Sequence, residues 1–288
     1  MFSNAIQCIL SASTRLAAIS LLCLLPFHKA LWSAACCTSA TAFGQGRLLR
    51  WETFAVGLKN HFEHELGRYD EDGRWGYYNA SIRKYELRNT VWAMGAVHEQ
   101  VSIFGEIPIV TPLISSELAS QSTTSLGDML VGARWQPIGI GEYLHVPGIA
   151  LSGAVILPTA DGPGSQVVTG RAKWGGALGM IIEHAWEPIY VQGHASANMT
   201  DGFGIGRSIG LDAGIEARRE LIFSGNVAFV YESKTDSFSP SVGIGAVWRA
   251  HPNWSIQTHG SMTPIADGLG KNTGGKYNVG LGIRYGYF

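Results

Sequence analysis

Hydrophobic side chains recur at every second position through most of this chain after residue 50, which restricts the folds open to it. In residues 208–218 one parity is apolar, while the charged residues Asp212, Glu216 and Arg218 all share the other. A period of two indicates a β-strand with one apolar and one polar face. Such strands belong either to an open sheet with a wet face or to a closed barrel with a wet interior.

Twelve segments of this kind follow one another, and their connectors alternate in length. The predicted strands are residues 53–64, 85–97, 101–110, 126–137, 147–159, 173–186, 188–200, 206–219, 221–233, 239–250, 254–265 and 276–288. Tight turns at 98–100, 187–188, 219–220 and 251–253 alternate with longer polar segments at 65–84, 111–125, 160–172, 201–205, 234–238 and 266–275, and 138–146 is a long exception among the short turns. Outer-membrane barrels have this asymmetry. The pattern predicts an all-β fold, a transmembrane up-and-down antiparallel β-barrel of about 12 strands.

Composition excludes some classes of protein and fits this one. Only 15% of the residues are charged and the formal net charge is −1, so the chain lacks the basic surface that nucleic-acid binding requires. No stretch after residue 42 approaches the roughly 18 consecutive apolar residues of a spanning helix. Barrel strands need only about ten residues of alternating polarity. The 37 glycines suit closely approaching strands and their turns.

The N-terminus has the features of an export signal. Arg15 supplies a positive charge, residues 16–27 form an apolar run, and Ala40-Thr41-Ala42 provides small residues before Phe43. This order predicts a signal peptide over residues 1–42, cleaved before Phe43, and a barrel domain over residues 43–288. An uncleaved membrane anchor is the alternative, but the run is short for a span and contains Pro26.

The cysteines agree with export of a barrel. All four precede Phe43, so the mature chain would hold neither a disulfide nor a thiolate. Soluble secreted domains often depend on disulfides, whereas a barrel closes its own hydrogen-bond ladder. A second processing route is lipidation at Cys36, since Ser33-Ala34-Ala35-Cys36 resembles a lipoprotein box. We expect the mature chain in the outer membrane of a Gram-negative bacterium.

Aromatic residues gather where the predicted strands end. Trp51, Trp135, Trp186, Trp248, Trp254, Tyr285 and Tyr287 would lie near the periplasmic edge, and Tyr85, Trp174 and Tyr231 near the opposite edge. Amphipathic rings favour the level of the lipid headgroups, where barrels carry aromatic girdles. Aromatics scattered through a soluble core are the alternative explanation.

The final segment, residues 276–288, is the most specific feature of the chain. It contains Gly282, then Tyr285 and Tyr287 on one parity, and it stops at Phe288. It resembles the C-terminal signal that the barrel-assembly machinery recognises, although Phe288 lies one residue past the usual phase. We predict that this strand pairs with the first one, which would leave the sheet without edges.

Three further segments resemble a known family. They are Val101–Val110 (VSIFGEIPIV), Ser125–Arg134 (SLGDMLVGAR) and Ile149–Gly162 (IALSGAVILPTADG). In this order and spacing they resemble the outer-membrane family named for the meta-pathway of phenol degradation, over about residues 85–288. The resemblance implies a β-barrel and a role in the passage of aromatic or other hydrophobic compounds.

If the apolar parity faces lipid, the opposite parity lines the lumen. The predicted lumen-lining residues are Glu106, Asp128, Arg134, Glu183, Asp212, Glu216, Arg218, Arg249 and Arg284. Charges in a confined space should pair, so they could form a salt-bridge network that stiffens the barrel. Alternatively they form a constriction that selects solutes by charge. Twelve strands leave room for a narrow pore but not a wide one.

Other chemistry has weaker support in the sequence. His259 and Ser261, like His194 and Ser196, have the His-x-Ser spacing of an outer-membrane phospholipase, but their parity points inward, away from lipid. His61 and His64 would point to opposite faces of a strand and could not share an ion. We therefore predict no catalytic residues, metal or cofactor.

The sequence thus predicts a passive channel whose partners are outer-membrane lipid, the assembly machinery and small solutes. A phospholipase-type enzyme and a structural or adhesive barrel without transport remain the alternatives.

Overall fold

A computed structural model of the chain describes most of the predicted barrel domain. It covers residues 48, 52–78, 82–115, 120–139, 146–160, 170–186, 188–202, 204–218 and 220–287, all within the unit Ser33–Phe288. The predicted signal peptide with its cleavage site, Cys36, Trp51 and Phe288 lie outside the described residues. No helix in these ranges is long and apolar enough to cross a membrane.

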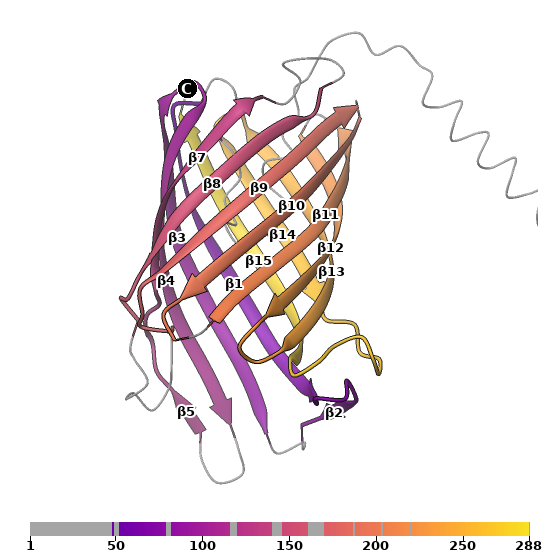
Figure 1. Cartoon of the computed structure of the whole chain (residues 1–288). Coiled ribbons are helices and arrows are strands. Elements are labelled where there is room, and N and C mark those ends of the chain that lie inside the picture. Colours follow the sequence, from indigo (N-terminus) through magenta and orange to yellow (C-terminus); the bar gives the residue numbers. More distant parts are fainter. Residues whose placement is uncertain are drawn as a thin grey trace, which may run out of the picture. The chain divides into compact units, whose positions relative to one another are not determined.

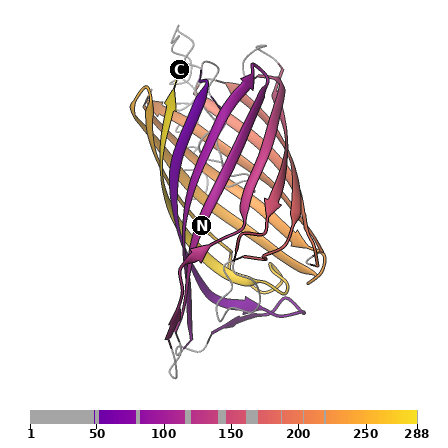
Figure 2. The same cartoon turned by 90° about the vertical axis from the view of Figure 1, so that its left-hand side faces the viewer.

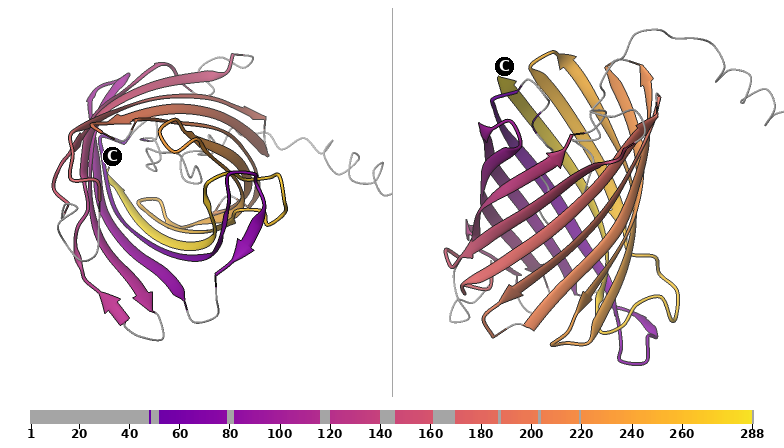
Figure 3. Two further views of the ribbon diagram at one scale, coloured as in Figure 1. Left: turned by 60° about the horizontal axis from the view of Figure 1, so that its bottom comes forward. Right: turned by 45° about the horizontal axis from the view of Figure 1, so that its top comes forward.

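The described chain is a single antiparallel sheet that closes on itself (Figure 1, Figure 3). Its 15 strands are β1 (Phe54–Tyr69), β2 (Trp75–Tyr77), β3 (Arg83–His98), β4 (Val101–Ser115), β5 (Ser120–Ser122), β6 (Ser125–Leu126), β7 (Met129–Ile138), β8 (Gly148–Leu157), β9 (Gly175–Trp186), β10 (Ile189–Thr200), β11 (Gly204–Arg218), β12 (Leu221–Glu232), β13 (Ser237–His251), β14 (Trp254–Met262) and β15 (Gly274–Tyr287). β2, β5 and β6 are short, and the other 12 strands form the wall. The predicted fold class and strand count are confirmed.

The first and last long strands close the barrel. β1 and β15 pair from Phe54↔Tyr287 to Arg68↔Gly274, with one register shift between Glu65 and Gly67. This pairing gives both edge strands a partner, which is how a sheet can cross a bilayer without unsatisfied backbone groups. The predicted pairing of the final segment with the first is therefore present in the structure.

Strand ends differ from the prediction mainly on the long-loop side. β1 runs to Tyr69 and β4 to Ser115, several residues beyond the predicted ends, and these strands project past the barrel rim (Figure 2). The predicted loops at 201–205 and 234–238 are tight turns instead. Gly202 and Gly204 have φ of 77° and 83°, and Asp236 has φ of 47°. These left-handed conformations, easy for glycine and tolerated by aspartate, close short hairpins where the sequence indicated longer loops.

Along most wall strands, exposed apolar side chains alternate with buried or half-buried inner ones. In β11, Ile209 is 61% exposed and Leu211 is 55% exposed. The next residue, Asp212, faces the other side of the sheet and is only 1% exposed. The buried apolar clusters Ala55–Trp92–Met94–Phe104–Ala177 and Tyr190–Ile222–Val247 draw on several strands each and lie on this second parity. The core is therefore inside the barrel, and its outer surface is apolar, as a lipid-facing surface must be.

Connections at the long-loop end brace one another. The Tyr69 hydroxyl donates a hydrogen bond to the Pro264 carbonyl and accepts one from the Ala266 amide at 3.2 Å. The Trp75 amide donates to Asp267 at 2.7 Å. The β1–β2 hairpin therefore packs against the β14–β15 connection, and both project from the same part of the rim (Figure 1).

Asp128 organises a second set of connections. Its Oδ2 accepts hydrogen bonds from the amides of Arg171, at 2.6 Å, and Ala172, at 3.2 Å, and its Oδ1 accepts one from the Ala160 amide at 3.2 Å. The carboxylate lies between β6 and β7, outside the regular strands, and holds both ends of the β8–β9 connection.

Candidate functional site: the barrel interior

The inner face of the barrel has two regions of different character. The first, called the packed end, lies in the half of the strands nearer the tight turns. It consists of buried inner residues: Glu52, Trp92, Met94, Phe104, Arg134, Glu183, Tyr190, Ile222, Val247 and Arg284. The second, called the wet wall, comprises half-buried or exposed polar residues: Lys59, His61, Glu63 and Glu65 of β1, Lys84, Glu86 and Arg88 of β3, His259 and Ser261 of β14, and Lys276 and Asn278 of β15.

A buried ion pair lies at the closing seam of the packed end. Arg284 of β15 donates from Nη1 to Glu52 Oε1 at 2.8 Å and from Nη2 to Glu52 Oε2, a bidentate arrangement. A Cβ at Gly286 would lie 1.9 Å from Glu52 Oε1, so glycine makes room for the carboxylate. Because both side chains are buried, each charge depends on the other for compensation.

A second buried pair lies on β10 and β11. His194 Nδ1 is 3.3 Å from Asp212 Oδ2, and the imidazole fits because position 210 is glycine. Gln192, directly opposite Asp212, is also buried. Asp212 Oδ1 and Gln192 Nε2 are buried without a hydrogen-bond partner in the structure. The alternation of side chains predicted the inward position of His194, whereas Gln192 was not among the predicted lumen residues.

The other predicted lumen residues occupy varied positions. Arg134 and Glu183 are buried on the inner face of β7 and β9. Glu106 lies opposite inward-facing Trp92, and Glu216 opposite buried Ile222. Arg249 is half-buried, and its Nη2 is enclosed without a hydrogen-bond partner in the structure. Their effect on solutes stays a prediction.

One of the predicted residues differs from the prediction. A register shift between Glu216 and Arg218 places Arg218 opposite Leu221, on the same face as exposed Trp248, so strict alternation fails at this strand end. Arg218 is itself exposed. Asp128 precedes β7 and accepts hydrogen bonds from loop amides, and its place in the lumen stays a prediction.

Ion pairs run along the wet wall. Lys276 Nζ is 2.6 Å from Glu63, Arg88 Nη2 is 2.8 Å from Glu86, and Lys84 Nζ is 4.0 Å from Glu65. Lys59 Nζ lies 5.6 Å from the centre of the Trp92 ring, a cation–π contact that joins the two regions.

The sequence prediction missed the whole charged set of the wet wall. In residues 59–65 both parities are polar, because outward-facing positions such as Asn60 and His64 are polar too, so the polarity contrast is weak. The signal that could have found them is the recurrence of Lys59, His61, Glu63 and Glu65 at every second position.

Histidines from two strands meet on this wall. His61 Nδ1 lies 3.4 Å from His259 Nε2, and the rings are stacked at 25° with centroids 5.5 Å apart. Both residues are opposite Gly280 of the strand between them. Ser261 donates to Asn278 at 2.6 Å. His64 points to the other face, where it stacks on Tyr85.

The outer face carries the predicted aromatic residues near the tight turns. Trp135, Trp186, Trp248, Trp254 and Tyr287 are exposed, and half-buried Tyr285 packs against Trp254 with ring centroids 4.9 Å apart. Trp174 and Tyr231 are exposed at the other end. Gly282 is buried on the inner parity of β15. A role for these residues at a membrane interface stays a prediction.

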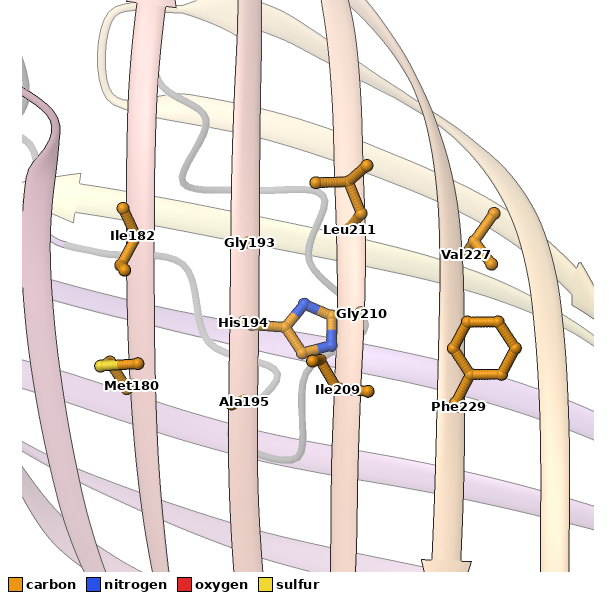
Figure 4. Close-up of a pocket in the computed structure, with 10 residues that line it drawn as sticks. All are labelled: Met180, Ile182, Gly193, His194, Ala195, Ile209, Gly210, Leu211, Val227 and Phe229. Atoms are coloured by element: carbon orange, nitrogen blue, oxygen red, sulfur yellow. The ribbon is translucent and has the colours of Figure 1, made fainter.

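An apolar groove of about 560 Å³ lies on the outer face across β9–β12 (Figure 4). Gly193 and Ala195 form its floor, and its sides are Met180, Ile182, Ile209, Leu211, Val227 and Phe229. The His194 imidazole reaches from β10 towards Gly210 of β11 (Figure 4). The wall is thin here because neither Gly193 nor Gly210 has a side chain.

Comparisons with known proteins support the fold. No protein-family model and no curated protein sequence matches the chain. An outer membrane channel from Pseudomonas putida F1 is similar in structure, with a TM-score of 0.68 and 8% identity over 82% of this chain and 96% of that chain. The β domain of the Bordetella autotransporter BrkA has a TM-score of 0.54 and 9% identity, covering 82% of this chain and 100% of that chain. The translocator domain of the autotransporter NalP from Neisseria meningitidis has a TM-score of 0.50 and 11% identity, over 82% and 88% of the two chains. This chain therefore has the fold of outer-membrane β-barrels.

Proposed function

We propose that this chain is an outer-membrane channel for the passive passage of small solutes. The observation that carries the proposal is a closed barrel with an apolar outside and a charged, half-buried wall inside. An apolar outer face favours lipid around the barrel, and inner charges such as Glu63 and Lys276 are stable because they pair and remain partly accessible to water. Outer-membrane lipid and the barrel-assembly machinery are the partners that this location implies.

The inner surface favours small amphipathic solutes. The wet wall adjoins apolar side chains of β3, β4 and β7, of which Trp92 and Phe104 are buried and Leu130 is half-buried. A solute with an aromatic ring and a polar group could contact Leu130 and the wet wall. The sequence resemblance to the family named for the meta-pathway of phenol degradation implies this class of solute, and the similar fold of the Pseudomonas putida channel agrees with a channel. We propose aromatic compounds with a polar substituent as the solutes.

The packed end favours a second candidate, a barrel without transport. Ten inner residues from the tight-turn half are buried, including the Glu52–Arg284 pair. Such packing stiffens a barrel, and a barrel filled by side chains would serve a structural or adhesive role through its loops. Conductance separates this candidate from the channel.

We further propose that the chain is not a phospholipase-type enzyme. Serine catalysis needs a histidine bonded to the serine hydroxyl. The Ser261 hydroxyl instead binds Asn278, and His259 binds His61. Both side chains have the inward parity, and their backbones are opposite inner positions of β15.

Single-channel recording in planar bilayers tests the channel. Purified, refolded protein should produce discrete current steps with a small conductance, and phenol carboxylates added on one side should reduce the current reversibly. Absence of current from protein that retains a folded barrel, shown by heat-modifiable gel migration, would favour the structural candidate. Release of fatty acid from phospholipid vesicles would contradict the exclusion of enzyme activity.

A further inference from the structure

We propose that His61 and His259 together bind one transition-metal dication, such as Zn²⁺ or Ni²⁺, on the inner wall of the barrel. The two residues are 198 positions apart in the sequence and belong to β1 and β14, which are joined only through β15. Closure of the barrel brings their imidazoles together. Neither residue takes part in the charge pairs of the wet wall.

The distance between the facing nitrogens fits a shared ion. His61 Nδ1 and His259 Nε2 are 3.4 Å apart. Zinc binds imidazole nitrogen at about 2.0–2.1 Å, so one ion touching both would have an N–metal–N angle of about 110°, which is close to tetrahedral. In the metal-free protein one ring donates its N–H to the other. On binding, that ring moves its proton to its other nitrogen, and both facing nitrogens then donate lone pairs.

Glycines shape the site around His259. A Cβ at Gly280 would lie 1.9 Å from His259 Cε1, so only glycine allows the imidazole to reach across β15 towards His61. On the other side, position 245, opposite His259 on β13, is also glycine. Both histidines are half-buried, and the missing side chains leave space in which water can complete the coordination of an ion.

The charged side chains around the two histidines leave room for the ion but do not supply a third ligand. Lys59 and Glu63 of β1, Glu86 and Arg88 of β3, and Lys276 of β15 share the inner face, while Gln257 and Ser261 are the neutral neighbours on β14. Both acids are engaged, Glu63 by Lys276 and Glu86 by Arg88. Within the described ranges no group of three or more His, Cys, Asp or Glu side chains is arranged for a metal. The ion would therefore have two imidazole ligands and water.

The chemistry of the ligands determines which metals fit. Imidazole suits Zn²⁺, Ni²⁺ and Cu²⁺, whereas Mg²⁺ and Ca²⁺ prefer oxygen ligands. Binding should weaken as the pH falls, since a protonated imidazole has no lone pair for the ion.

Calorimetric titration of the folded, tag-free protein in detergent tests the site. We expect one Zn²⁺ or Ni²⁺ per chain and no saturable binding of Mg²⁺. His61→Gln and His259→Gln keep the side-chain size and should each weaken binding at least tenfold. Gly280→Ala removes no ligand, yet it should also weaken binding because its methyl group would displace the His259 ring. Matched controls are His64→Gln and His184→Gln, which alter histidines on the outer face and should leave binding unchanged.

A spectroscopic readout distinguishes ligation from a general effect on folding. The electron paramagnetic resonance spectrum of bound Cu²⁺ should show hyperfine coupling to two imidazole nitrogens, which His61→Gln and His259→Gln should each reduce to one while both variants keep heat-modifiable migration. Equal affinity in these variants and the parent protein would overturn the proposal, as would the absence of saturable binding in the parent. Binding is measured without current, so failure here would leave the proposed channel function standing.

Discussion

The packed end and the wet wall share strands and residue types, yet they hold charge in different ways. At the packed end Glu52 and Arg284 are buried and bound at two points. On the wet wall Glu86 and Arg88 also pair, but the Arg88 side chain is 47% exposed. A buried charge depends on its partner, because removing one side chain of the pair leaves the other charge with neither a partner nor water. An exposed charge is screened by water whether or not its partner is present. The comparison indicates that the packed end stabilises the barrel, and we predict that the wet wall sets the charge that a solute encounters.

The largest expected effect comes from breaking the buried pair. Arg284→Ala leaves the Glu52 carboxylate enclosed without its partner and should lower the free energy of unfolding by about 3–5 kcal/mol. The matched change on the wet wall, Arg88→Ala, should cost under about 1 kcal/mol. Urea unfolding of vesicle-inserted protein, followed by tryptophan fluorescence, measures both. Equal losses in the two variants would remove the distinction between the regions.

Changes on the wet wall are expected to alter the charge selectivity of the pore more than its stability. Changing Glu63, Glu65 and Glu86 together to glutamine leaves four cations on the wet wall, so the reversal potential in a salt gradient should shift towards anions. Stability should change little, because these pairs are half-exposed. The outer-face variant His64→Gln is the control. An unchanged reversal potential in a conducting triple variant would show that solutes do not pass this wall.

A smaller, local effect is expected at Asp128. Asp128→Ala removes the acceptor of three backbone hydrogen bonds that hold the β8–β9 connection. We expect a loss of about 1–3 kcal/mol in local stability and faster tryptic cleavage after Arg171 and Lys173, with the global unfolding midpoint nearly unchanged. Arg134→Ala, at the packed end, should instead lower the global unfolding midpoint and leave tryptic cleavage after Arg171 and Lys173 nearly unchanged. Should Asp128→Ala instead lower the global midpoint as much as Arg134→Ala, the loop role would be wrong.

The smallest effect is expected from an ion pair between exposed connections. Lys271 binds Asp236, and the hydrogen bond from Lys271 lowers the pKa of the Asp236 carboxyl below its ordinary value of 3.8. The same bond raises the pKa of the Lys271 amine above its ordinary value of 10.5. The depressed carboxyl pKa means that the contribution of Asp236 is present above pH 3.8 and is lost as the pH falls through the lowered value. The raised amine pKa means that the contribution of Lys271 is fully present below pH 10.5 and is lost as the pH rises through the raised value.

Hydrogen exchange tests this pair. The amides of Phe238 and Lys271, each 2.9 Å from the other residue's carbonyl oxygen, should keep constant protection from about pH 5 to about pH 9 after correction for intrinsic rates. Protection should fall below that window. In Asp236→Asn the amides should be less protected throughout and should show no drop at low pH. A drop that persists in Asp236→Asn would have to come from another group.

Local sequence patterns were sufficient to predict the barrel. Alternation with a period of two depends only on neighbouring residues, and all 12 predicted segments are strands. The same pattern placed Arg134, Glu183, Asp212 and Arg284 on the parity that is buried. It failed at Arg218, where a register shift reverses the face, and along residues 59–65, where both parities are polar.

The sequence by itself determined the alternation of faces, the number of strands and the closing segment. Each of these depends only on the order of polar and apolar residues that are close together in the chain. Only the tertiary structure decided which side chains meet. Glu52 and Arg284 are 232 positions apart and His61 and His259 are 198 apart, and each contact exists because β1 pairs with β15 in one register. That register results from closing the whole sheet, which no local period encodes.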